Sequence, residues 1–179
     1  MAGSLELSLN ADADVFEFNM LWRDVEMKKM RRADRMMTNG EAFELLERGE
    51  YGILCTADSE GQPLGTPLSF VFTGKNIYFH AATAGAKLNN IKANPKVCFT
   101  VVGATEVLPG DFSTNYESVM AFGTATLAEG EEKALALAEI VKKYSPDFIQ
   151  EGDAYILANI DNCIVARIAV DQFSGKHRI

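Results

Sequence analysis

The apolar residues of segment 39–48 recur at helical spacing, between a polar start and a closing glycine. Thr38 and Glu41 stand three residues apart at this start, which is the spacing of a capping box, where each side chain bonds the other residue's backbone N–H. Gly49 follows the last apolar turn, as glycine often does where a helix ends. The pattern predicts a short helix over residues 39–48.

The next apolar stretches have the length and composition of β-strands. Residues 51–56, 63–73 and 76–80 are rich in aliphatic and aromatic side chains, and turn-forming residues such as Gly61 separate them. Their short connections predict a three-stranded antiparallel meander. Pro67 has no N–H to give to a strand ladder, so we expect it at a sheet edge or a bulge.

Three further strands are predicted in the second half of the chain. Residues 97–103 and 116–127 form two of them, joined by a loop over residues 103–115 that is rich in Gly, Pro, Asp, Ser and Thr. Gly123 interrupts the second strand, which indicates a β-bulge or the close approach of another backbone. Residues 162–170 predict the last strand.

A longer helix is predicted between these strands. Residues 131–144 have one apolar side, glutamates in the first turn and lysines in the last, which matches the helix dipole. Gly130 is the expected N-cap. Residues 153–158 predict a helical fragment, and residues 173–179 are assigned to a tail after the last strand.

Together these elements predict a mainly β fold with peripheral helices. About six strands, joined mostly by hairpins, favour a six-stranded antiparallel β-barrel, because closure removes exposed strand edges. The length of 179 residues fits one domain. We assign residues 30–179 to this domain and residues 1–29 to an N-terminal arm.

Charge and hydropathy exclude several classes of partner. The net charge of −8 argues against broad binding to nucleic acid or to an anionic membrane. No apolar run approaches the roughly 20 residues that span a bilayer, and no secretory signal is visible. We therefore expect a cytoplasmic protein without a membrane or nucleic-acid partner.

The cysteines and histidines argue against a disulfide framework and against a metal site. Cys55, Cys98 and Cys163 are far apart, and each lies inside an apolar run, which is typical of buried thiols in a reducing cytoplasm. There is no Cys-x-x-Cys motif, and His80 and His177 are the only histidines, so no metal is expected.

Residues 77–95 form the strongest candidate site. The segment begins as a strand, breaks at small residues, becomes a short helix and stops before Pro95, with His80 at the strand end and Lys87 near the helix start. Free N–H groups and the helix dipole make such a start a plausible anion site, where a phosphate would also neutralise Lys87. The alternatives are a hydrogen-bonded structural histidine and a solvated surface lysine.

The segment Thr66–Ser69 is a second candidate, since it places hydroxyls and free backbone groups beside a proline break. The alternative is an ordinary edge strand with polar outward positions. No phosphate-binding glycine loop is present. Neither Ser69 nor Ser118 lies in a Gly-x-Ser-x-Gly elbow, so nucleophilic catalysis is not indicated.

Several short motifs occur in an order and spacing that are specific only together. They are residues 30–35, 49–56, 61–70, 77–82, 85–91, 94–99 and 116–119, followed by Gly123. This order resembles the pyridoxamine 5′-phosphate oxidase-like flavoproteins, and most closely the branch that includes the nitroimidazole-resistance (Nim) proteins. The resemblance implies an FMN-binding split β-barrel that works as a homodimer, with two flavins in the dimer interface.

The resemblance also implies which residues bind the cofactor. They are Thr66, Pro67, Leu68, Ser69, Phe79, His80, Lys87, Asn90, Tyr116, Ser118 and Val119. Segment 66–69 is expected to line the isoalloxazine and His80 to stand near the flavin. Lys87 and Asn90 are expected at the phosphate, and segment 116–119 on the interface strand.

The function implied by the resemblance is an FMN-dependent oxidoreductase that reduces a small organic substrate, with His80 as the catalytic residue. Family members commonly have Gly-His-Lys where this chain has Gly85-Ala86-Lys87. The chain also lacks the C-terminal tryptophan and arginine pattern of true pyridoxamine phosphate oxidases, so a vitamin B6 substrate is not implied. Two alternatives are a non-catalytic module that carries FMN or haem, with His80 and His177 as ligands, and a structural dimer with a vestigial site.

Overall fold

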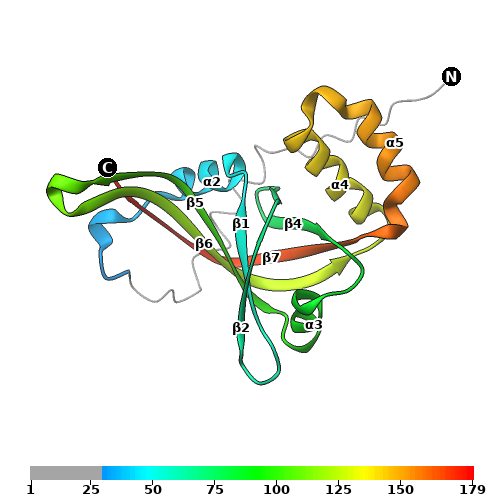
Figure 1. The fold of residues 1–179 in the computed structure, drawn as a ribbon, viewed down its shortest axis with the longest axis horizontal. Helices are drawn as coiled ribbons and strands as arrows, with labels where there is room; N and C mark the ends of the chain where they lie inside the picture. Colours follow the sequence, from blue (N-terminus) through cyan, green and yellow to red (C-terminus); the bar gives the residue numbers. More distant parts are fainter. Residues whose placement is uncertain (1–29) are drawn as a thin grey trace.

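A computed structural model describes residues 30–179, so the N-terminal arm assigned to residues 1–29 lies outside the described residues. The described chain is built on one antiparallel sheet with the strand order β2-β1-β5-β6-β7-β4-β3 (Figure 1). The strands are β1 (Gly52–Ala57), β2 (Pro63–Leu68), β3 (Val71–Phe72), β4 (Asn76–Ala81), β5 (Lys96–Leu108), β6 (Ser113–Ala128) and β7 (Ile164–Arg178). The mainly β fold is confirmed, with seven strands in this part of the chain in place of six.

The predicted meander of residues 51–56, 63–73 and 76–80 is wrong. The stretch 63–73 breaks at Ser69-Phe70 into β2 and β3, and these two strands lie at opposite ends of the strand order. β2 pairs with β1, whereas β3 pairs with β4. The chain leaves the ladder at Phe70 because both its N–H and its C=O bond the hydroxyl of Tyr144, at 2.9 and 2.8 Å.

The predicted loop over residues 103–115 is also wrong, because β5 and β6 continue through it as a long hairpin. The hairpin projects beyond the rest of the sheet and turns at a short 3₁₀-helix, η3 (Pro109–Asp111) (Figure 1). The pairing of β5 with β6 is irregular at one place in this hairpin, where a register shift between Val102 and Thr105 marks a bulge at Gly103. The Glu117 carboxylate holds this bulge, since it accepts a bond from the Ala104 N–H and pairs with Arg48.

β7 is longer than predicted, because residues 173–178 continue the strand. They pair with β6 as far as Tyr116 opposite Arg178. The predicted irregularity at Gly123 is confirmed by a register shift between Phe122 and Gly123. A Cβ at Gly123 would lie 2.2 Å from the carbonyl oxygen of Ala169, so the neighbouring backbone leaves room only for glycine.

Helices pack against the sheet at several places (Figure 1). The helices are α2 (Asn39–Arg48), α3 (Ala86–Ala93), α4 (Gly130–Tyr144) and α5 (Ile149–Asn159), with short 3₁₀ turns η2 (Ala33–Arg35), η4 (Pro146–Phe148) and η5 (Ile160–Asn162). α2 packs on β6 and β7, α3 on β1, and α4 on β3 and β4. The capping box of Thr38 and Glu41 is confirmed. Gly130 is the first residue of α4, with φ 55°, and the N-cap is Glu129, one residue earlier than predicted.

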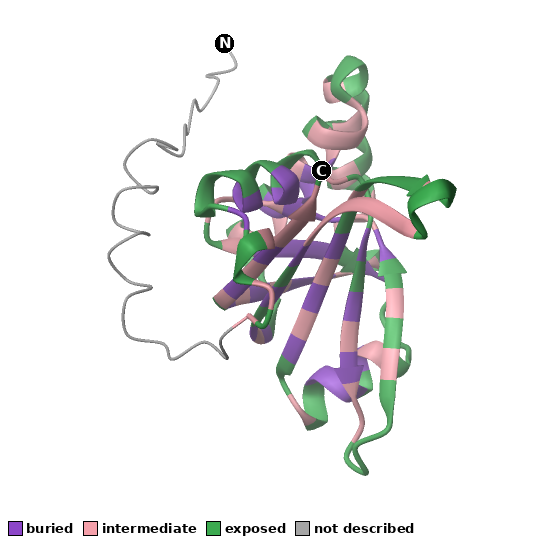
Figure 2. Cartoon of the chain, turned by 90° about the vertical axis from the view of Figure 1, so that its left-hand side faces the viewer, coloured by how far each residue is buried: buried purple, intermediate pink, exposed green. Residues whose placement is uncertain are grey.

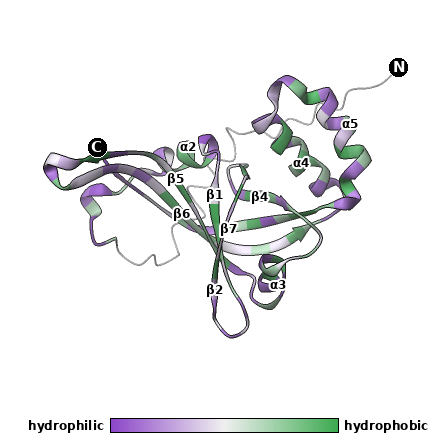
Figure 3. Ribbon diagram, in the orientation of Figure 1, coloured by the Kyte–Doolittle hydropathy of each residue, from purple (hydrophilic) through white to green (hydrophobic). Residues whose placement is uncertain are grey.

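Alternate residues of the strands point into one core (Figure 2). Phe70, Phe79 and Phe99 are fully buried in it, and α2 closes it from one side. A second cluster lies between α4 and β4, around Tyr78 and Val165. β1 and α4 are among the elements coloured toward the hydrophobic end in Figure 3.

The three cysteines are free thiols, but the prediction that they are buried is wrong. Cys55, Cys98 and Cys163 are all only partly buried. The apolar runs around them are strands with one inward and one outward side, and the first two cysteines stand on the outward side. Within residues 30–179, no helix is long and apolar enough to cross a membrane.

Candidate functional site

The end of β4 and the start of α3 form an open, polar corner of the molecule. His80 is exposed on β4 opposite Val165 of β7, while the adjacent Phe79 is fully buried in the core. Residues 82–86 are all exposed. Gly85 is the N-cap of α3 with φ 147°, a conformation that side-chain-bearing residues rarely adopt.

The first turn of α3 has backbone donors that the chain's own side chains do not cap. Gly85 makes no side-chain cap bond, and the first turn contains no acidic residue. The Leu88 N–H donates to the Gly85 carbonyl, so the N–H groups of Ala86 and Lys87 are the ones that face solvent, together with the positive end of the helix dipole. This suits an anion such as a phosphate. Lys87 is the second residue of the helix and is partly exposed, so its ammonium group can reach the same position.

Asn90 lies elsewhere, although it is only one turn from Lys87. Its side chain is 8% exposed and its Nδ2 donates to the Thr56 hydroxyl on β1, at 3.1 Å. Leu88 and Ile91 are buried beside it, so these three residues form the face by which α3 packs on the sheet. The structure therefore separates Asn90, in the packing, from Lys87, at the open helix start.

The segment Thr66–Ser69 runs along the outer edge of the sheet, as Pro67 predicted. β2 is a terminal strand, Pro67 is exposed, and Leu68 is buried. β3 pairs with β4 through Val71 opposite Tyr78, and the antiparallel direction sends the preceding Ser69 toward the His80 end of β4. The fold thus brings the end of this segment toward the corner that holds His80.

Segment 116–119 is far from that corner within one chain. Tyr116 and Ser118 are partly exposed, whereas the Val119 side chain is fully buried in the core. Ser118 pairs with residue 176 of β7, whereas His80 pairs with residue 165, so about 35 Å of extended strand separates them. One flavin cannot touch both places in the same chain.

The sheet also has an outward face with several apolar side chains, which we call the outer face. Its members, joined row by row across β1, β5 and β6, are Ile53, Cys55, Cys98, Thr100, Met120 and Phe122. Ile53, Met120 and Phe122 are 40%, 43% and 39% exposed. Three large apolar side chains in adjoining rows are typical of a surface that binds another protein.

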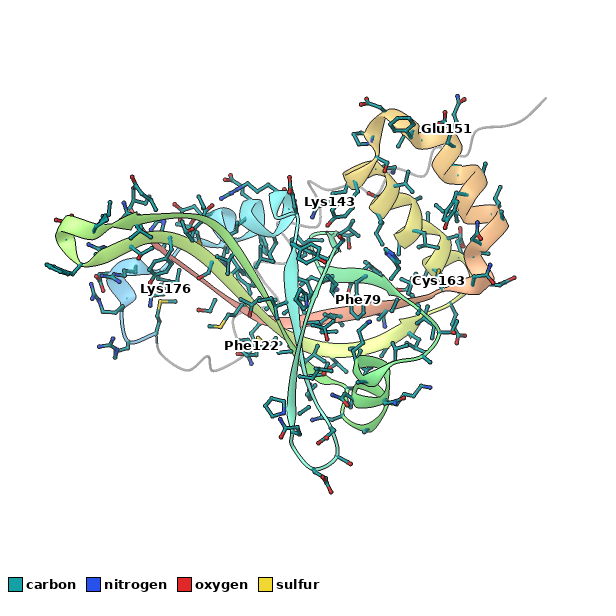
Figure 4. All side chains as sticks on the ribbon, viewed as in Figure 1. Phe79, Phe122, Lys143, Glu151, Cys163 and Lys176 are labelled. Atoms are coloured by element: carbon teal, nitrogen blue, oxygen red, sulfur yellow. The ribbon has the colours of Figure 1, made fainter. Side chains whose placement is uncertain are left out.

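Two residues at the end of α4 support the candidate site and were not identified from the sequence. The Tyr144 hydroxyl donates to the carbonyls of Glu50 and Phe70 and accepts from the Phe70 N–H. Lys143 Nζ donates to the Gly49 carbonyl at 2.7 Å and lies 4.0 Å from the centre of the Phe70 ring (Figure 4). The two side chains hold the break that carries Ser69 against the rest of the fold.

Burial shifts the pKa of both groups. It lowers the pKa of the Lys143 ammonium to about 8, despite the nearby carboxylates of Glu50 and Glu47. It also raises the pKa of the Tyr144 phenol, so this hydroxyl stays protonated and able to donate. No sequence signal could reveal these contacts, because they join residues more than 70 positions apart.

A third contact fixes α4 over the face of β4 that carries His80. The Glu132 carboxylate accepts bonds from the Tyr78 hydroxyl at 2.9 Å and from Arg167 at 3.1 Å. Burial, followed by the Glu132 carboxylate, raises the pKa of Tyr78 to about 12. Since Tyr78 and His80 alternate with core residues on the same strand face, this anchoring also defines one wall beside His80.

Among residues 30–179, no group of three or more His, Cys, Asp or Glu side chains is placed to hold a metal ion. The chemistry that the corner offers is therefore hydrogen bonding from backbone N–H groups, the ammonium group of Lys87 and the imidazole of His80. These donors suit an anionic, phosphate-bearing ligand.

Comparison with known proteins identifies the class of the chain. Its fold is that of the split β-barrels related to pyridoxamine 5′-phosphate oxidase. The family model described as pyridoxamine 5′-phosphate oxidase matches residues 38–177, so the chain belongs to this family. No curated protein sequence gives a significant match.

Solved structures show the same fold at low sequence identity. A conserved hypothetical protein of Mycobacterium tuberculosis, Rv2991, aligns with a TM-score of 0.71 at 19% identity, over 83% of this chain and 90% of its own. A FAD and heme binding protein of Mycobacterium smegmatis aligns with a TM-score of 0.69 at 18% identity, over 78% and 71%. A 5-nitroimidazole antibiotic resistance protein of Bacteroides thetaiotaomicron aligns with a TM-score of 0.64 at 23% identity, over 80% and 86%.

Proposed function

We propose that this protein is an FMN-dependent oxidoreductase of the nitroimidazole-reductase type, which works as a homodimer on a small organic substrate in the cytoplasm. The observation that carries the proposal is the uncapped, solvent-facing start of α3 beside the exposed His80, in a chain of this family. The similarity of its fold to a FAD and heme binding protein supports a flavin ligand, and the similarity to a nitroimidazole resistance protein supports the substrate class.

The described residues fit the phosphate of a flavin. The free N–H groups of the first turn of α3 and the Lys87 ammonium group bind the phosphate, and Gly85 lets the chain turn tightly in front of it. Ala86 supplies no side-chain donor, so the backbone and Lys87 carry this interaction. Asn90 supports the site from the core by fixing α3 on β1.

When bound, the flavin supplies the electron transfer, and the protein positions it. His80 is exposed at the strand end, where its imidazole donates a hydrogen bond or a proton to the substrate. Ser69 and its neighbours on β2 line the ring, held in place by the contacts of Tyr144 with Phe70.

We infer a homodimer because the predicted cofactor residues of one chain lie too far apart to contact one flavin. Tyr116 and Ser118 lie about 35 Å along β7 from His80, so they contact a flavin only if a second copy brings its own β6 to that corner. The outer face offers exposed apolar surface for such a contact. Native mass spectrometry of the purified chain should report twice the chain mass with bound flavin, and a monomer without flavin would contradict the proposal.

The phosphate site is tested by titrating the protein with FMN, with FAD and with riboflavin, which lacks the phosphate. Lys87→Ala should weaken FMN binding about 10- to 100-fold, because a lost charge-assisted hydrogen bond costs about 1.5–3 kcal/mol. Lys92→Ala, at the other end of α3, is the matched control and should leave binding unchanged. Equal FMN affinities of the two variants, or an equal effect of Lys87→Ala on riboflavin, would refute the site.

Catalysis is tested by reducing the bound flavin and following its reoxidation by a 5-nitroimidazole in a single turnover. His80→Gln should slow this step roughly 100-fold, as loss of a proton donor does, and should weaken FMN binding much less than Lys87→Ala does. Lys92→Ala, at the far end of α3, is again the control. If His80→Gln reacts at the rate of the wild-type protein, His80 is not the catalytic residue.

A second candidate is a module that carries flavin or haem without turnover, and the fold similarity to a FAD and heme binding protein favours it. In one chain His80 and His177 cannot ligate the same haem, since residue 165, the partner of His80 on β7, and His177 itself lie about 40 Å apart along that strand. Haem titration with a spectral shift that His80→Ala abolishes would favour this module over the oxidoreductase.

A further inference from the structure

The outer face contains two cysteines at directly opposed positions of neighbouring strands. Cys55 of β1 pairs with Cys98 of β5 in the antiparallel register, one row away from Ile53 opposite Thr100. Opposed residues in antiparallel strands have Cα atoms about 4.5–5.5 Å apart, which lies inside the range that a disulfide bridges. Both residues are free thiols in the described chain.

Both sulfur atoms stand on the same side of the sheet. The neighbours of Cys55 on β1, Leu54 and Thr56, are buried in the core, and so are those of Cys98 on β5, Val97 and Phe99. Because successive side chains of a strand alternate between the two faces, both thiols point outward. Both residues are only partly buried, so each thiol is in reach of a small molecule.

The residues around the pair leave room for reaction. Gly65, which pairs with Cys55 on the edge strand, has no side chain to cover the sulfur. Phe122 pairs with Cys98 from the other side, on β6. The Cys98 sulfur makes one weak contact, 3.9 Å to the Thr100 hydroxyl. The pair is thus open on the side of β2 and lined by an aromatic ring on the side of β6.

From this register we propose that Cys55 and Cys98 form a reversible cross-strand dithiol that a low-molecular-weight disulfide oxidises. The thiolate of one cysteine attacks the small disulfide, forms a mixed disulfide and releases one thiolate. The second cysteine then attacks the protein sulfur of that mixed disulfide, so the intramolecular bond forms and the second small thiolate leaves. The protein loses two electrons and two protons, and the small disulfide becomes two thiols.

Cys163 does not take part, because it precedes β7 at the far end of the sheet, where its sulfur contacts the Ile160 carbonyl. Burial raises the pKa of the Cys98 thiol, so exchange should speed up as the pH rises. The bond would tie β1, and with it the edge strand β2, to β5. The proposal depends on strand register alone, so it stands or falls independently of flavin binding.

The experiment equilibrates the full-length protein with mixtures of reduced and oxidised glutathione, at about pH 8.5, where thiolates form readily. Free thiols are then blocked, and the protein is digested with trypsin without reduction. Cleavage at the lysines between the two cysteines separates peptide 49–75 from peptide 97–133, so a bond between them gives one linked species. If a dimer covers the outer face, glutathione reaches the cysteines only when the dimer dissociates. Equilibration removes the effect of this dissociation rate on the amount of linked species.

The expected result is the linked species in wild-type protein and in Cys163→Ser, and its loss after reduction. Cys55→Ser should instead hold glutathione on Cys98. Glutathione on both cysteines without a link, no modification of either cysteine, or a link only between two copies on a non-reducing gel would each overturn the proposal. Since wild-type protein gives the primary result, the test does not depend on the folding of a variant.

Discussion

Replacing Tyr144 with phenylalanine removes one hydroxyl that serves three backbone groups. In the native fold it accepts from the Phe70 N–H at 2.9 Å and shares its proton between the Phe70 and Glu50 carbonyls, at 2.8 and 2.7 Å. Phe70 is fully buried, whereas Glu50 is exposed and its carbonyl can turn to water. Two buried polar groups therefore lose their partner.

The magnitude follows from those two groups. Each buried backbone group left without a partner costs about 1–3 kcal/mol, so the loss of two should lower the free energy of unfolding by about 2–6 kcal/mol. With a urea dependence of about 2 kcal/mol per molar, the midpoint should fall by about 1–3 M. The break that carries Ser69 should also loosen, and hydrogen exchange at the Phe70 amide should accelerate.

The assay is urea unfolding followed by circular dichroism, combined with hydrogen exchange. Tyr155→Phe is the matched control, because it removes the same hydroxyl group from a side chain on α5 that is 70% exposed. An effect of Tyr144→Phe within about 0.5 kcal/mol of the control would refute the reasoning, since changes of that size are usual for surface positions. So would unchanged exchange at Phe70.

Two further predictions concern stability. Gly123→Ala should lower the free energy of unfolding by about 2–3 kcal/mol, because the new Cβ would lie 2.2 Å from the Ala169 carbonyl oxygen. Thermal unfolding measures this loss. Gly110→Ala is the control and should have little effect, because there is open space around Gly110. Lys143→Met should show how the lysine pKa, lowered to about 8, links stability to pH. The folded state releases this proton near pH 8 and the unfolded state only near its ordinary value, so wild-type protein should gain stability relative to the variant as pH rises from about 8 to 10. Parallel pH profiles of the two proteins would contradict the low pKa.

The proposals for the outer face connect dimerisation and thiol chemistry. Phe122 lies in the same row as the opposed cysteines and Met120 in the adjoining row, so a second copy that covers these apolar side chains also covers the dithiol. Oxidation should then be slower in the dimer than in the monomer. A rate of glutathione exchange that falls as protein concentration rises would show this coupling directly.

Much of the fold could be predicted because its signals are local. The capping box of Thr38 and Glu41 lies within one helical turn, and the bulge at Gly123 is marked by a single residue. The family resemblance also identified the β4–α3 corner, and the structure places His80 and Lys87 there together. In each case residues a few positions apart decide the conformation.

The sequence by itself therefore determined the helices, most strand cores, the fold class and the corner that holds His80 and Lys87. Only the tertiary structure decided that β2 and β3 part at Ser69-Phe70, that residues 103–115 extend a hairpin, and that Asn90 is buried against Thr56. The physical reason is that these outcomes depend on partners distant in sequence, such as the Tyr144 hydroxyl that takes both backbone groups of Phe70 out of the ladder. The pairing of Cys55 with Cys98 on the outer face likewise depends on the register between two strands, which no short motif encodes.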